Sequence, residues 1–107
     1  MTRPLRSRFM GHTFRIKYLA KVEVEGKESN GSCDMDTNTI EIAENLLPSK
    51  ERETLIHEIL HQLLQTGVTV PDTLEEPLVE FLGASLAAHI EQNKGFWTYV
   101  CRDLTKK

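Results

Sequence analysis

Two histidines, His57 and His61, lie four residues apart and enclose Glu58 within a stretch of helical periodicity. One helical turn separates the histidines, so their imidazole rings project from the same face of the helix. Two neutral imidazoles in this arrangement can bind one Zn²⁺ ion and leave positions for a third ligand and a water molecule. Zinc lowers the pKa of such a water, and Glu58 can then take up its proton. We therefore predict a zinc site with Glu58 as general base.

The motif lies in a capped amphipathic helix. Ser49 can cap the N-terminus, and Glu51 and Glu53 fall in the first turn, where the helix dipole favours acids. Gly67 is suited to end the helix near residue 66. Apolar residues at helical spacing are expected to face the core, namely Leu55, Ile56, Ile59, Leu60, Leu63 and Leu64. The alternative is a metal-free helix with two exposed or core-satisfied histidines and a surface glutamate.

A third ligand is expected from a second helix, over residues 73–93. Glu76 and Glu80 share a face that continues with Gly83 and Ala87, and these small residues would let the two helices approach closely. The other faces are apolar, so the helix is expected to be buried. A buried helix seldom presents two carboxylates unless they are paired, hydrogen-bonded or bound to metal. The alternative is that both are first-turn acids favoured by the dipole, as we expect for Glu75.

Pro77 decides which glutamate is the better candidate. Proline lacks a backbone N–H and is tolerated in the first turn of a helix, so Glu76 would have to lie at its very start. If the helix begins at Pro77 itself, Glu76 becomes a cap and Glu80 the more suitable ligand.

The N-terminal half predicts strands. Alternating residues indicate a strand over 13–19, followed by a less regular extended segment to residue 26. Further short strands at 32–35 and 39–42 flank Asp36, Thr37 and Asn38, which suit a tight hairpin turn. We predict an α+β fold with a small antiparallel sheet before the two helices. Residues 1–10 are expected to form a basic tail, residues 11–107 a single domain, and Phe96 to Leu104 a segment packed on the core.

Composition limits the classes of protein. The chain has 107 residues, of which 39% are hydrophobic, and a formal net charge of −3. This charge disfavours a nucleic-acid partner, and no apolar stretch is long enough to span a membrane. Cys33 and Cys101 have no paired spacing, so free thiols in a cytoplasmic protein are expected. The basic N-terminus is loosely like an organellar presequence, but its alternation of apolar and basic residues is typical of a strand.

The motif and the following glutamates resemble a known family. His57, Glu58 and His61 on one helix, with a glutamate from the next, are similar to the gluzincin branch of the zincin metallopeptidases. In size and element order the chain resembles minimal members of that branch and the ImmA/IrrE-type metallopeptidases often encoded by phages and mobile elements. The resemblance covers roughly residues 31–93. It implies a zincin-like fold, zinc as cofactor, a protein or peptide substrate, and a phage-encoded or bacterial cytoplasmic enzyme.

The resemblance also implies roles for particular residues. Glu76 would be the third zinc ligand and Glu80 the acid that orients a metal-binding histidine, although the reverse assignment is also found among gluzincins. The strand before the motif helix would edge the cleft and pair with an extended peptide substrate. That strand is formed by Thr39, Ile40, Glu41 and Ile42.

Two functional classes remain open. The first is a zinc-dependent endopeptidase, favoured because a purely structural zinc site needs no general base and Glu58 is present. The second is a binding or assembly module in which zinc stabilises the fold, favoured because so short a chain has little room for a deep specificity pocket. A metal-free scaffold is a third, weaker possibility. By chemistry alone, the residues that could stabilise an oxyanion are His12, Tyr18, His89 and Tyr99. His89 falls on the opposite face of its helix from Glu76 and Glu80, so we expect it to be structural.

Overall fold

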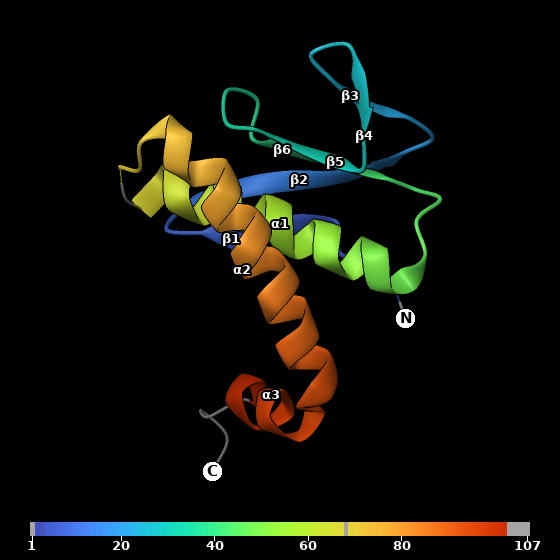
Figure 1. Ribbon diagram of the computed structural model, residues 1–107, viewed down its shortest axis with the longest axis vertical. Coiled ribbons are helices and arrows are strands. Elements are labelled where there is room, and N and C mark those ends of the chain that lie inside the picture. The colour runs from blue at the N-terminus through green and yellow to red at the C-terminus, as the bar shows by residue number, and fades with distance from the viewer. Residues whose placement is uncertain (1, 68, 103–107) are drawn as a thin grey trace.

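Alternating apolar residues of the N-terminal half form a four-stranded sheet, and the C-terminal half forms three helices. The computed structural model describes residues 2–67 and 69–102 and has an α+β fold (Figure 1). The strands are β1 (Arg6–Phe9), β2 (His12–Leu19), β3 (Val22–Val24), β4 (Lys27–Ser29), β5 (Gly31–Asp34) and β6 (Thr39–Ala43). The helices are α1 (Pro48–Gly67), α2 (Asp72–Gln92) and α3 (Lys94–Cys101).

The main sheet is mixed rather than antiparallel. Its strand order is β1-β2-β6-β5, and β1 and β5 pair in antiparallel fashion with β2 and β6, respectively. The central pair is parallel, with Ile16 opposite Ile40 and Tyr18 opposite Ile42. The prediction of an antiparallel sheet is wrong at this pair. After β2 the chain passes through β3, β4 and β5, and β6 then runs beside β2 in the same direction. The β3–β4 hairpin forms a separate two-stranded ribbon and rises from the sheet on the side away from α1 (Figure 1).

Part of the expected N-terminal tail belongs to the sheet. Residues 6–9 form β1, whose Ser7 is opposite Phe14 in β2. Met10 and Gly11 join the two strands with φ angles of 50° and 83°. A two-residue loop with positive φ at both positions matches the right-handed twist of the strands that it connects. The Asp36–Asn38 turn agrees with the prediction, and the Asp34 carboxylate accepts a hydrogen bond from the Asp36 N–H at 2.9 Å.

The core lies between one face of the sheet and α1. Phe14, Ile16, Ile40 and Ile42 form a buried cluster, against which Leu55 and Ile59 of α1 pack. The apolar arc expected on α1 is only half-buried, and the most buried residues of this helix are polar: Thr54, Glu58 and Gln62. Gln62 accepts a hydrogen bond from the Ser7 hydroxyl at 2.7 Å and donates to the Ser7 carbonyl at 3.2 Å, so it ties α1 to β1.

The expectation that α2 is buried on all sides is wrong. Its buried face consists of Glu75, Val79, Gly83 and Ala87, which recur every four residues and lie against α1. Leu74 and Phe81 are 59% and 67% exposed, and the C-terminal part of α2 extends beyond the sheet (Figure 1). The helix begins at Asp72, so Pro77 lies in its second turn and deprives the Thr73 carbonyl of a helical donor.

The C-terminal segment does not pack on the core as expected. Residues 94–101 form α3, which packs on the far end of α2, away from the sheet (Figure 1). Phe96, Tyr99 and Val100 are exposed, while the Trp97 indole donates to His89 Nδ1 at 3.0 Å. Leu104, the expected end of this segment, lies outside the described residues. None of the helices in the described part of the chain is both long and apolar enough to cross a membrane.

Candidate metal centre

The histidine pair lies where α1 packs against α2. The rings of His57 and His61 have centroids 5.1 Å apart. Gly83 of α2 faces His57, and a Cβ atom at Gly83 would lie only 3.4 Å from the His57 Cα. The small residues predicted on the contact face of α2 therefore do let the two helices come together at the motif.

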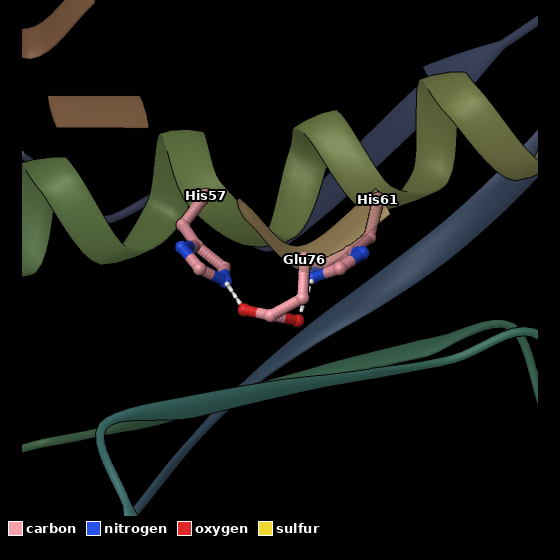
Figure 2. A group of neighbouring side chains, drawn as sticks. All are labelled: His57, His61 and Glu76. Carbon is pink, nitrogen blue, oxygen red and sulfur yellow. Dashed lines mark ion pairs between the residues drawn. The ribbon is translucent and has the colours of Figure 1, made fainter. Parts of the chain in front are cut away.

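Glu76 completes a group of three possible metal ligands. Its Oε1 lies 2.9 Å from His57 Nε2, and its Oε2 lies 3.0 Å from His61 Nε2 (Figure 2). One donor atom from each residue falls within 4.8 Å of the other two. Zinc with ligand distances of about 2.0–2.1 Å holds tetrahedral donors roughly 3.3 Å apart, so small side-chain adjustments bring these three to a zinc site. The side chains of His57 and His61 are mostly buried, and Glu76 is more exposed.

Glu75 holds His61 from the other side of its ring. Its Oε2 lies 2.6 Å from His61 Nδ1 and accepts a second hydrogen bond, also of 2.6 Å, from the Gln65 amide. Burial alone would raise the pKa of Glu75, but the hydrogen bonds from Gln65 and His61 and the charge of His61 outweigh it and lower the pKa. An ionised carboxylate can only accept, so Nδ1 donates and directs Nε2 toward Glu76.

Glu75 is a first-turn acid of α2, as expected, and it also makes the histidine contact that was expected of Glu80. Among the described residues, the carboxylates that contact the two histidines are Glu75 and Glu76, while Glu80 is exposed one turn further along α2. Glu75 lies on the same face of α2 as Val79 and Gly83, which face α1. Glu76 is rotated from Glu75 by about 100° about the helix axis, so it points into the cleft.

Glu58 lies between α1 and the edge strand β5. Its side chain is buried, and its Oε2 would be 3.1 Å from a Cβ atom placed on Gly31. Burial raises the pKa of Glu58 to about 7, with His61 lowering it and Glu76 raising it further. Glu58 is not part of the convergent ligand group, which is the arrangement expected of a base beside a metal rather than a ligand.

A cavity of about 750 Å³ opens in front of these side chains. It contains His57, Glu58, His61, Glu76 and Glu80 on its helical side. Its other walls come from the β3–β4 hairpin, β5, and the first turns and the last turn of α1, with Val24, Ser29, Asn30, Gly31, Ser32, Cys33, Lys50, Glu53, Thr54 and Gln65. The hollow is larger than an ion needs and can admit a chain of several residues.

The strand that edges this cavity is β5, so the prediction for Thr39 to Ile42 is wrong. These residues lie in β6, which is paired on one side with β2 and on the other with β5. Their backbone groups are occupied by the sheet and cannot pair with a further chain. The polar composition of Gly31–Asp34 was the available signal, because polar residues are favoured on edge strands.

The backbone of β5 has one set of outward-facing groups near the site. The Ala43 N–H donates to the Asn30 carbonyl at 2.8 Å, so the N–H and C=O of Asn30 face β6. Because these groups point to opposite sides in successive residues of a strand, those of Gly31 and Cys33 point away from β6. The Ser29 hydroxyl accepts a hydrogen bond from the Gly31 N–H at 3.3 Å and donates one to the Gly31 carbonyl at 2.8 Å. The N–H and C=O of Cys33 thus face outward at the mouth of the cavity.

The four candidates for oxyanion stabilisation lie elsewhere. His12, Tyr18, His89 and Tyr99 are not among the residues that line the cavity. The Tyr18 hydroxyl donates to the Pro4 carbonyl at 2.7 Å, and His89 is bound to Trp97. Side-chain donors that do line the cavity include Asn30 and Ser32.

Comparisons of the chain with protein-family models, curated proteins and solved structures give no match. Function is therefore inferred from the arrangement of the side chains.

Proposed function

We propose that this chain is a zinc-dependent endopeptidase with a zincin-like arrangement of its two central helices. The observation that supports this most strongly is the convergence of His57, His61 and Glu76 on one point. A fourth residue, Glu58, lies beside them without joining the group. A ligand set of two histidines and one carboxylate is typical of catalytic zinc, which keeps a coordination position open.

The donor atoms fit the metal chemically. Both histidines present Nε2 to Glu76, and the contact of His61 Nδ1 with Glu75 leaves Nε2 as its available ligand atom. In the structure the two Nε2 atoms lie 2.9 Å and 3.0 Å from the Glu76 carboxylate. Bound zinc would be held by these three groups, polarise a substrate carbonyl and lower the pKa of a coordinated water to about 7.

Each residue around the metal has a distinct role. Glu58 takes the proton of the attacking water and delivers it to the leaving amine, which requires a carboxylate that stays close to the metal without binding it. Its burial against Gly31 fixes its position. Glu75 fixes the orientation of His61, and Gln65 fixes Glu75.

Substrate is bound along β5 in an extended conformation. The outward N–H and C=O of Cys33 pair with the substrate backbone, as in other cases where a peptide adds to a sheet edge. The substrate chain then runs between β5 and α1, past the histidines. Main-chain pairing is largely independent of side chains, so β5 positions the scissile bond and leaves sequence preference to the cavity walls.

One observation favours a second function, a zinc-stabilised binding or assembly module. The arm formed by α2 and α3 exposes Leu74, Leu78, Phe81, Phe96, Tyr99 and Val100. Exposed apolar residues in such number are typical of surfaces that contact another protein. This function would need the metal site for stability and would not need Glu58 as a base.

Metal content tests the basis of both functions. Protein purified without chelators should contain one zinc ion per chain by elemental analysis, and His57→Ala and His61→Ala should each lose it. Glu53→Gln is the matched control, since Glu53 lines the same cavity but lies outside the ligand group. Wild-type protein without any transition metal, prepared in zinc-supplemented medium, would contradict the proposal.

A further inference from the structure

The face of the sheet opposite α1 carries a group of basic side chains over β1 and β2. Phe14 and Ile16 point into the core, so Arg15 and Lys17, which alternate with them, point away from it. Ser7 is opposite Phe14 and bonds to Gln62, which turns its neighbours on β1 outward. We call the resulting set the basic patch: Arg6, Arg8, Arg15 and Lys17, all exposed.

The basic patch is only partly balanced by acids. Arg6 is directly opposite Arg15 in the β1–β2 register, and like charges at such a position destabilise a sheet. Among the described residues, no ion pair involves any of the four, whereas Arg3 and Arg52 pair with Glu51 and Glu91. Acids lie on the side away from β1: Glu41 is opposite Lys17 in β6, and it lines a hollow with Glu23, Asp34, Asp36, Arg15 and Lys17, whereas Arg6 and Arg8 lie outside that hollow.

Protection of the sheet edge accounts for only part of the basic patch. Charged residues on β1 discourage pairing with another chain because β1 is an edge strand. Arg15 lies on β2, which is paired on both sides, so its charge has no such role. Folding alone gives no reason to place Arg15 opposite Arg6.

The chemistry of the basic patch suits phosphate groups. The outward positions from Arg6 to Lys17 are Arg6, Arg8, Thr13, Arg15 and Lys17, all of them hydrogen-bond donors and none of them apolar. A protein interface normally needs an apolar centre, which is missing here. Contacts to a phosphodiester backbone need only positive charge and donors, and arginine binds phosphate through two parallel bonds.

We propose that the basic patch binds the phosphate backbone of a nucleic acid, without reading its sequence. The net charge of −3 argued against such a partner, but net charge does not report how charge is distributed. The basic patch and the candidate metal centre lie on opposite faces of the sheet.

The test is a binding titration of untagged protein with a labelled 20-base-pair duplex and a single strand of equal length, over a range of salt concentrations. Four phosphate contacts predict a slope of log K against log salt of about −3 to −4 for the duplex. Arg6→Gln combined with Arg15→Gln should reduce this slope by about 2 and weaken binding at low salt by at least about tenfold. Arg8→Gln alone should reduce the slope by about 1.

The matched control removes two cations from the helical side, Arg52→Gln with Lys94→Gln, and should bind as wild type does. The Arg6→Gln, Arg15→Gln protein should melt at the same temperature as wild type or higher, because a like-charge pair is removed. Absence of binding at low salt would overturn the proposal. Equal loss of binding in the control variant, or equal affinity for a polyglutamate peptide, would also overturn it.

Discussion

Glu75 accepts a 2.6 Å hydrogen bond from Nδ1 of His61, on the side of the ring opposite the Glu76 carboxylate. This contact makes Glu75 the candidate for orienting His61, a role separate from the metal ligation proposed for Glu76. Removing such a partner typically weakens metal affinity by about 10–100-fold without abolishing binding. We therefore expect Glu75→Gln to bind zinc more weakly by that factor. Competition with a chromogenic chelator measures it, and Glu80→Gln is the control that should keep wild-type affinity.

Glu76 should be the more important of the two cavity glutamates for metal binding. Its oxygens contact both histidines at 2.9 Å and 3.0 Å, whereas Glu80 lies one turn further along α2. Glu76→Gln should weaken zinc binding more than either Glu75→Gln or Glu80→Gln, because it removes a charged ligand from a three-residue site. The same chelator competition ranks the three variants. A larger loss in Glu80→Gln than in Glu76→Gln would exchange the roles of these two residues.

Gly31 should tolerate no side chain. A Cβ atom there would lie 2.8 Å from Thr54 Cγ2, 3.1 Å from the Glu41 carbonyl oxygen and 3.1 Å from Glu58 Oε2. Gly31→Ala should lower the free energy of unfolding by about 1–3 kcal/mol, as overpacking of a tight site does. Denaturant unfolding measures the change. Gly95→Ala is the matched control: it has no neighbour within 4 Å and should be neutral or slightly stabilising in α3.

The two cysteines should be free and differ in reactivity. Both are unpaired in the structure, Cys33 half-buried and Cys101 exposed. Burial raises the pKa of Cys33 to about 12, assisted by the charges of Glu58, Asp34 and Glu75. A shift from 9.0 to about 12 reduces the thiolate fraction at pH 8 by about a thousandfold, so iodoacetamide should label Cys101 long before Cys33.

The raised pKa of Cys33 also makes the stability of the protein depend on pH. The neutral thiol of Cys33 favours the folded state. This contribution to stability is complete below pH 9, the pKa of cysteine in an unfolded chain, and is lost as the pH rises toward 12.

Peptide mapping of alkylated protein measures the labelling rates of the two cysteines. Equal rates at both cysteines, or a mass two hydrogens lower than that of the reduced protein, would contradict the prediction.

Local patterns in the sequence were sufficient for the motif helix. The spacing of His57 and His61 depends only on helical geometry, so their common face follows directly from the sequence. Glu76, preferred over Glu80 because of the family resemblance, does lie beside them. Ligation of a metal by these three residues remains a prediction.

The role of Glu75 could not be read from the chain. Glu75 and Glu76 differ by one step of rotation about α2, and that rotation is set by how Val79 and Gly83 pack on α1. The edge strand was missed for a similar reason, since strand order depends on long-range pairing. The exposed residues of α2 and α3 show that apolar composition alone does not establish burial.

Cleavage of a mixed peptide library by zinc-loaded wild type and Glu58→Gln, followed by mass spectrometry, tests the central claim most directly. Glutamine keeps the size of Glu58 and removes its basicity, so both proteins should hold one zinc ion and melt at similar temperatures. Loss of general acid–base catalysis should slow cleavage by about 10²–10⁴-fold in Glu58→Gln, while Glu53→Gln should cleave as wild type does. Equal cleavage by wild type and Glu58→Gln, or no cleavage by fully zinc-loaded wild type, would contradict a peptidase built on this site.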